Sequence, residues 1–276
     1  MTAVAQEPGW TVVGARRPSS PDRSVTARRG GFWSRPAWRE FVLLAAVYEL
    51  YTLTRQVTAG GAGEAAANAR AALRAEHAVG LAPERWLNHA VSIRPLLAVP
   101  ADYAYATLHY AVTLVVLVWL WRAHRSVYLP ARRTLMAATL LGLVGFVSVP
   151  LAPPRMMPGF IDTMARYGHD GWWGSAASAP KGLGSFTNQF AAMPSLHVCW
   201  AIWCGVVVAR YAQRVWIRRL AVAYPVLVVL VVMSTANHYL VDAVAGLAVL
   251  LIGYGIVRTA ARLGWLKPAP PTPTET

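Results

Sequence analysis

The sequence is poor in cysteine and in charge. Of its 276 residues only Cys199 and Cys204 are cysteines, and both fall in one apolar stretch. Side chains five positions apart on a helix point in different directions, so we expect neither a disulfide framework nor a cysteine metal site. Charged residues make up 14% of the chain and hydrophobic residues 56%, with a mean hydropathy of +0.38. This composition excludes an ordinary soluble domain and predicts that lipid surrounds much of the protein.

Long apolar runs are what the sequence has instead. A helix needs roughly 20 apolar residues to cross about 30 Å of hydrocarbon. Six runs qualify: about 38–57, 100–121, 133–151, 193–212, 216–236 and 238–258. They predict an all-α membrane protein with six transmembrane helices. The first run begins too late for a secretory signal peptide, so we expect it to remain as an anchor.

The chain is predicted to form one membrane domain with two tails. The membrane domain covers residues 37–262 and holds all six runs. Residues 1–36 are rich in Arg, Ser, Pro and Gly, and residues 263–276 are rich in Pro and Thr. Neither segment has apolar periodicity, so both are predicted to be disordered.

Acidic residues are scarce, with 12 against 26 basic residues and a net charge of +14. In a soluble protein this excess would indicate a nucleic-acid partner. Here the arginines gather before the first run, between the second and third, between the fourth and fifth, and after the sixth. These alternate connections share one side, which the positive-inside rule identifies as the cytoplasm. We therefore expect cytoplasmic termini, a multi-pass protein of the cell membrane, and no nucleic-acid partner.

Two outer connections are long. The alanine-rich residues 62–91 predict two short amphipathic helices at the outer membrane surface, with a solvated connector as the alternative. Residues 152–192 form a long loop with Trp172, Trp173 and Lys181, and loops of this length usually serve binding. Within the apolar runs, the polar residues Glu49 and His109 are expected to pair inside the bundle or to line the approach to a site.

The motif P-S-L-H, residues 194–197, opens the fourth run. Proline suits the first helical position, where no N–H is needed. The free N–H groups of a first helical turn, together with the helix dipole, form a site for an anion such as phosphate. The Ser195 hydroxyl adds a donor there, and His197 lies in the same turn.

A second polar motif, H-Y-L-V-D, opens the sixth run. His238 and Asp242 are four residues apart and share a helical face. A carboxylate so placed accepts a hydrogen bond from one imidazole nitrogen and leaves the other as a nucleophile or base. The third run ends on the same outer face, just before Arg155. We therefore expect Arg155, Ser195, His197, His238 and Asp242 to meet in one site.

The same residues allow a metal site as an alternative. Two imidazoles and a carboxylate, here His197, His238 and Asp242, are a familiar zinc ligand set. The neighbouring Arg155 would repel a cation and attract an anion, so we predict a site without metal and without any other cofactor.

These motifs resemble those of the phosphatidic acid phosphatase type 2 superfamily of membrane enzymes. The resemblance covers roughly residues 40–258, and the forms A-P-P-R at 152–155 and P-S-L-H are similar to the branch of the fungal inositol phosphorylceramide synthases. Two phosphate-binding cations of the family pattern are absent, because its lysine falls at Ser148 and its second arginine at Val232. Lys181 or Arg166 in the outer loop is the candidate substitute.

The resemblance implies a metal-independent lipid phosphatase or phosphotransferase with a phosphohistidine intermediate. His238 would be the nucleophile, Asp242 its orienting carboxylate and His197 the acid and base. Phosphate would be bound by Arg155, Ser195 and Lys181. Hydrolysis of a lipid phosphate or diphosphate is the leading prediction. The alternatives are transfer of a phospho-head-group, such as phosphoinositol, to an alcohol acceptor, and a non-catalytic lipid-binding or transport protein.

Overall fold

A computed structural model describes residues 42, 46, 49, 61–173 and 189–266. The chain divides into Met1–Leu44 and Ala45–Thr276, and every helix discussed below belongs to the second unit. The predicted N-terminal tail, nearly all of the predicted first span, Lys181 and the last ten residues lie outside the described residues.

Four helices of the described part are long and apolar enough to cross a membrane. The first runs from Pro95 to Ala123 and consists of α4 (Pro95–Tyr103), a π-helical turn (Ala104–Leu108) and α5 (His109–Ala123). The others are α6 (Arg125–Ser148), α9 (Val215–Ser234) and α10 (Leu240–Arg262). They coincide with the second, third, fifth and sixth predicted runs and indicate a membrane protein.

The fourth predicted run forms a shorter apolar helix, α8 (Leu196–Tyr211), of 16 residues. At 1.5 Å per residue it is about 24 Å long, so its crossing of the membrane stays a prediction. Ser195 is its N-cap, and the Ser195 hydroxyl accepts a hydrogen bond from the Val198 N–H at 3.4 Å. Pro194 thus precedes the helix, and the predicted placement of this proline at the first helical position is wrong.

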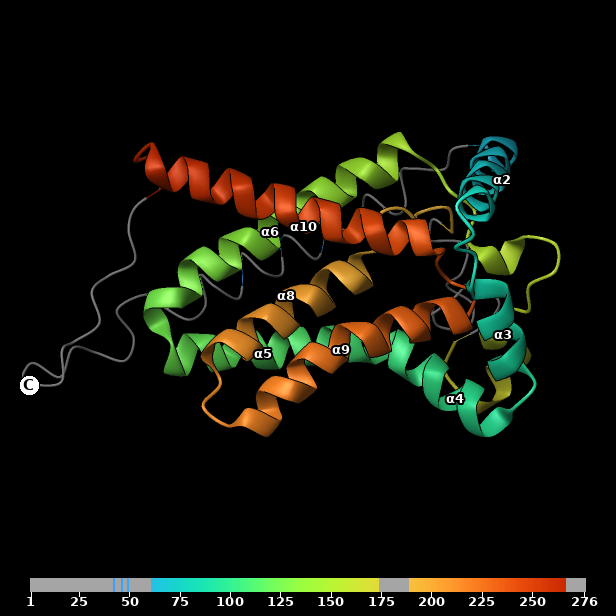
Figure 1. The fold of residues 1–276 in the computed structure, drawn as a ribbon, viewed down its shortest axis with the longest axis horizontal. Helices are drawn as coiled ribbons and strands as arrows, with labels where there is room; N and C mark the ends of the chain where they lie inside the picture. Colours follow the sequence, from blue (N-terminus) through green and yellow to red (C-terminus); the bar gives the residue numbers. More distant parts are fainter. Residues whose placement is uncertain (1–41, 43–45, 47–48, 50–60, 174–188, 267–276) are drawn as a thin grey trace, which may run out of the picture. The chain divides into compact units, whose positions relative to one another are not determined.

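The long helices approach one another closely at glycines. α8 packs along α9 and α10, α10 also packs along α6, and α5 packs against α8 (Figure 1). A Cβ atom at Gly246 of α10 would lie 2.5 Å from the Ser195 carbonyl oxygen. A Cβ atom at Gly253 would lie 2.8 Å from the Ala138 nitrogen of α6. The backbone of α10 therefore rests directly on α8 and α6, which fixes the position of its first turn.

Two shorter helices, α2 (Ala62–Ala78) and α3 (Glu84–Ser92), lie at the end of the bundle where α9 ends and α10 begins (Figure 1). The segment thus forms two short helices, as predicted, and their place at the outer membrane surface stays a prediction. Their buried faces are partly polar, however, because Glu76, Glu84 and Asn88 are all buried. The Asn88 side-chain amide donates to the Ser234 carbonyl at 2.9 Å, which ties α3 to the end of α9.

The loop between α6 and α8 crosses the same end of the bundle. Its described part includes the 3-10 turns Pro154–Met156 and Gly168–Asp170 and the short helix α7 (Thr163–Arg166). Leu151 and Ala191 form a parallel bridge that brings the two ends of the loop together. The Ala152 N–H donates to the Ala65 carbonyl of α2 at 3.1 Å. The loop, α2 and the start of α10 therefore form one packed layer.

The substitution Gly246→Ala tests the close contact between α10 and α8. The added methyl group has to displace the Ser195 backbone, so we expect a loss of about 1–3 kcal/mol in the free energy of unfolding. Thermal unfolding of the purified protein in detergent measures it. Gly255→Ala is the matched control, because nothing lies within 4 Å of a Cβ there. Equal stability of the two variants would contradict the contact.

Candidate active site

The linker between α9 and α10 carries His238, and the first turn of α10 carries Asp242. Nδ1 of His238 faces Oδ2 of Asp242 at 3.3 Å, so a protonated Nδ1 donates to the carboxylate. The same oxygen accepts the Tyr239 N–H at 3.0 Å. Asp242 is fully buried and His238 is 4% exposed. The carboxylate thus holds the orientation of the imidazole and caps its own helix.

Ser195 joins the starts of α8 and α10. Its backbone N–H donates to the Asp242 carbonyl at 2.9 Å, while its hydroxyl caps α8. The side chain is fully buried. These contacts give Ser195 a structural role. Its contact with phosphate stays a prediction.

His197, the second residue of α8, lies next to His238, and the centroids of the two rings are 5.5 Å apart. Tyr105 stacks on the His197 ring at 4.5 Å with an interplanar angle of 15°. The ring of His109 lies 3.9 Å from that of His197, centroid to centroid. His197 is half-buried, so it is the more accessible of the two predicted catalytic imidazoles.

The π-helical turn Ala104–Leu108 includes Tyr105 and immediately precedes His109. Such turns are rare and frequently occur at functional sites. For His109 the sequence offered one signal, a polar residue within an apolar run, and the structure places it beside the site. Tyr105 carried no such signal. The other polar residue singled out in the apolar runs, Glu49, is exposed.

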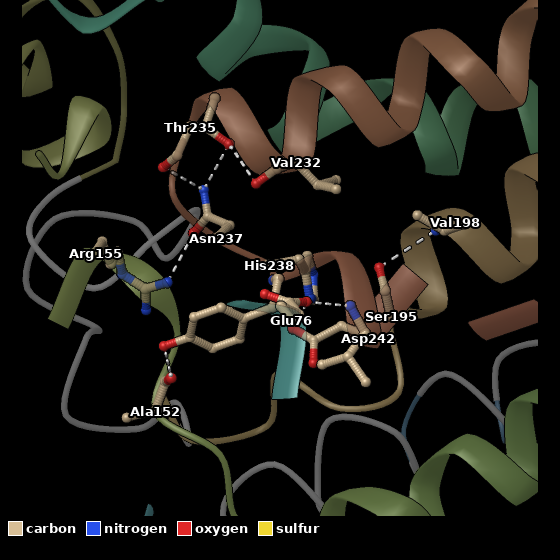
Figure 2. A network of polar contacts seen from close by, with 12 residues as sticks. Glu76, Ala152, Arg155, Ser195, Val198, Val232, Thr235, Asn237, His238 and Asp242 are labelled. Atoms are coloured by element: carbon tan, nitrogen blue, oxygen red, sulfur yellow. Dashed lines mark hydrogen bonds and ion pairs between the residues drawn. The ribbon is translucent and has the colours of Figure 1, made fainter. Parts of the chain in front are cut away.

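Arg155 is held beside this linker by both its backbone and its side chain. Its N–H donates to the Ala236 carbonyl at 2.7 Å, and its Nη1 donates to Oδ1 of Asn237 at 2.7 Å. Asn237 is fixed in turn by Thr235, whose hydroxyl and carbonyl oxygens accept from its amide. Figure 2 shows this chain of contacts next to His238 and Asp242. The Arg155 side chain is only 4% exposed, with Asp162 3.8 Å away.

The surroundings of His238 favour its neutral form. Burial lowers its pKa from 6.5 to about 3; the positive charge of Arg155 adds to this, and a hydrogen bond to the Ala192 backbone opposes it. A neutral imidazole has the lone pair that a nucleophile or base requires. Burial raises the pKa of Asp162, and Arg155 works against that rise.

The two positions where the family pattern has a cation lie in different surroundings. Val232 is fully buried in an apolar cluster with Val198 and Val228, where a charge would be costly. Ser148 is exposed and donates to the Val144 carbonyl of its own helix at 2.8 Å. Of the two candidate substitutes, Arg166 is exposed, with its guanidinium over the Tyr167 ring, and Lys181 lies outside the described residues.

Within the described ranges, no group of three or more His, Cys, Asp or Glu side chains is arranged to hold a metal ion. The structure brings five predicted residues together from three segments: Arg155, Ser195, His197, His238 and Asp242. It also adds residues that sequence analysis missed, namely Tyr105, Asn237 and a buried glutamate, Glu76, whose Oε1 accepts the Val241 N–H of α10 at 2.6 Å.

A family model described as the PAP2 superfamily matches residues 70–256, from α2 to α10. The chain belongs to this superfamily. It is the phosphatidic acid phosphatase type 2 superfamily that the motifs resemble, and membership suggests a phosphatase-type enzyme of lipid phosphates. No curated protein and no solved structure matches the chain. The synthase-like branch stays a prediction.

Replacing His238 by glutamine tests its buried neutral state. Because its folded-state pKa is below the usual 6.5, the native state resists protonation and loses stability as pH falls from 6.5 toward about 3. We expect His238→Gln to lose less apparent melting temperature between pH 7 and pH 5 than wild type does. The difference should reach about 2–4 °C or more.

The control for this experiment is His77→Gln, which removes an exposed imidazole on α2. It should follow the wild-type curve. If His238→Gln and wild type were equally sensitive to acid, the buried neutral imidazole would be contradicted.

Proposed function

We propose that the protein is an integral membrane phosphatase that hydrolyses a lipid phosphate or diphosphate through a phosphohistidine at His238. The observation that carries this proposal is the pair of imidazoles, His197 and His238, with ring centroids 5.5 Å apart and Asp242 on Nδ1 of the second. Arg155 beside them supplies the positive charge that a phosphoryl group needs.

In the first half-reaction the nitrogen of His238 that does not face Asp242 attacks phosphorus. The bond from phosphorus to the lipid oxygen breaks as the nitrogen–phosphorus bond forms. Protonated His197 gives its proton to the departing lipid oxygen and becomes neutral. The Asp242 carboxylate stabilises the positive charge that develops on the His238 ring.

In the second half-reaction neutral His197 takes a proton from water, and the water oxygen attacks phosphorus. The nitrogen–phosphorus bond breaks, inorganic phosphate leaves, and His238 returns to its neutral form. His197 is again protonated and ready for the next turnover. His197 thus serves first as acid and then as base, which its half-buried position beside His238 supports.

Charge on the phosphoryl oxygens is stabilised by Arg155 and by the first turn of α8. The guanidinium is oriented by Asn237, whose Oδ1 accepts from Nη1 at 2.7 Å. The N-terminus of α8 contributes the positive end of its dipole. Lys181 and the Ser195 hydroxyl complete the proposed phosphate-binding set.

A second candidate function is transfer of the phospho-head-group to an alcohol. The motif forms A-P-P-R and P-S-L-H, similar to the synthase branch, favour it. An alcohol would replace water in the second half-reaction and lose its proton to His197 in the same way. In either case we place the site at the outer face of the cell membrane, where the lipid phosphate meets the surface while its tail stays in the bilayer.

The decisive experiment offers purified protein in detergent, with EDTA, a panel of lipid phosphates and diphosphates, with and without inositol or another alcohol. We expect release of inorganic phosphate. A new phosphate ester of the added alcohol would instead support the transferase. Inactivity across the panel would favour a non-catalytic lipid-binding or transport protein.

The substitution His238→Ala removes the proposed nucleophile. We expect turnover to disappear while the melting temperature stays within a few degrees of wild type, with His77→Ala as the control at an exposed histidine. Incubation with radiolabelled substrate and rapid quenching should label wild type but not the variant. Near-wild-type turnover without His238 would rule out this nucleophile.

The substitution Asp242→Asn tests the orienting carboxylate. An amide cannot stabilise the charged imidazole and permits the wrong tautomer, so kcat should fall on the order of 10²–10⁴-fold without disappearing. Steady-state kinetics on the substrate found in the panel measures this loss. Unchanged kcat would refute the role of Asp242.

A further inference from the structure

Two glutamates are buried behind the first turn of α10. Glu76, in the last turn of α2, is 5% exposed, and Glu84, the first residue of α3, is fully buried. The chain reverses between them at Gly80, whose φ of +70° is in the left-handed region that glycine favours. The Leu81 N–H then donates to the Glu76 carbonyl at 2.9 Å. This turn brings the two side chains together.

Glu76 binds the backbone of α10 beside the proposed catalytic pair. Its Oε1 accepts the Val241 N–H at 2.6 Å, and Val241 is the neighbour of Asp242. This N–H belongs to the first turn of the helix, which has no intrahelical partner for it. Asp242 accepts the Tyr239 N–H in the same turn. Figure 2 shows the Glu76 carboxyl alongside Asp242 and His238.

In the described part of the protein, most side-chain oxygens of the two glutamates lack a hydrogen-bond donor. The Glu84 carboxyl lies close enough to that of Glu76 to raise its pKa. Oε2 of Glu76 and both side-chain oxygens of Glu84 meet no donor from the rest of the described chain. A proton on Oε2 of Glu76 would supply the hydrogen that two ionised carboxylates lack.

The pKa of Glu76 agrees with a proton held there at neutral pH. Burial and the nearby Glu84 side chain raise it from 4.5 to about 9, the Val241 N–H opposes the rise, and the charges of Glu84 and Asp242 add to it. Tyr239 and Arg155 are the other ionisable groups of this cluster. Protonated on Oε2, Glu76 donates to Glu84 while Oε1 accepts from Val241.

We propose that Glu76 and Glu84 are positioning residues, a carboxyl pair that shares one proton and fixes the start of α10 so that Asp242 stays against His238. The shared proton allows a strong acceptor to cap α10 without a second full charge beside Asp242. Loss of the proton would leave three buried carboxylates in one cluster, whose repulsion pushes Asp242 from its place. The effect on turnover rests on the proposed function, whereas the pairing itself does not.

Two variants of Glu76 separate hydrogen bonding from charge. Glu76→Gln keeps an oxygen for the Val241 N–H and offers an amide N–H to Glu84, so kcat should stay within about threefold of wild type. Glu76→Leu leaves both groups unsatisfied, so kcat should fall about tenfold or more with KM little changed. Glu64→Gln and Glu64→Leu, at an exposed position in the first turn of α2, are the matched controls.

A second readout does not depend on activity. A folded-state pKa raised from 4.5 to about 9 means that the stability from the shared proton is complete below pH 4.5 and is lost as pH rises to about 9. The apparent melting temperature of wild type in detergent should therefore fall between pH 7 and pH 9. Glu76→Gln has no such proton and should fall less over the same interval, by at least about 2–4 °C.

These readouts distinguish the two proposals. If wild type is inactive on the lipid panel while Glu76→Gln still reduces the loss of melting temperature between pH 7 and pH 9, the proposed function is refuted and the carboxyl pair is supported. If the melting temperatures of wild type and Glu76→Gln fall equally between pH 7 and pH 9, the carboxyl pair is overturned, whether or not the enzyme is active. Loss of kcat in Glu76→Gln as large as in Glu76→Leu would overturn the positioning role, and so would wild-type kcat in a folded Glu76→Leu. If Glu76→Leu does not fold, Glu76→Gln still decides.

Discussion

The first turn of α10 is the constraint on which the rest of the site depends. It buries an imidazole, a carboxylate and free backbone N–H groups, and each of these is costly to remove from water without a partner. The partners come from the turn itself and from two distant segments: Asp242 for His238 and Tyr239, Glu76 of α2 for Val241, and Ser195 for the Asp242 carbonyl. Hydrogen bonds to this single turn therefore hold α2 and α8 at this end of the bundle.

Close backbone contact between α10 and α8 fixes the geometry of the site. Gly246 lets α10 lie on the Ser195 carbonyl, so the start of α8 cannot move independently of the start of α10. His197 and His238 belong to these two starts, and the distance between their rings follows from the contact. A side chain at position 246 would separate the helices, even though this position lies outside the predicted catalytic set.

Sequence reasoning succeeded where short-range pattern and chemistry coincide. The spacing of His238 and Asp242 predicted that their side chains meet, which they do, although His238 precedes α10 and does not lie on it. The P-S-L-H motif predicted a helix start, and α8 begins there. Sequence reasoning missed Glu76 and Glu84, because charged residues in an alanine-rich segment indicate a solvated face, and only packing against α10 buries them. Tyr105 depends on a π-helical turn that leaves no periodic signal. Leu196, not Pro194, is the first residue of α8, and the Ser195 hydroxyl caps the helix.

The two helix starts differ in a way that indicates where a phosphate would bind. The backbone N–H groups at the start of α10 are already bonded to the protein's own carboxyl groups, those of Asp242 and Glu76. The first turn of α8 contains no acidic residue, and its cap is the neutral hydroxyl of Ser195. The positive end of the α8 dipole is therefore left for an external anion. An oxyanion placed there would lie next to His197, the proposed acid.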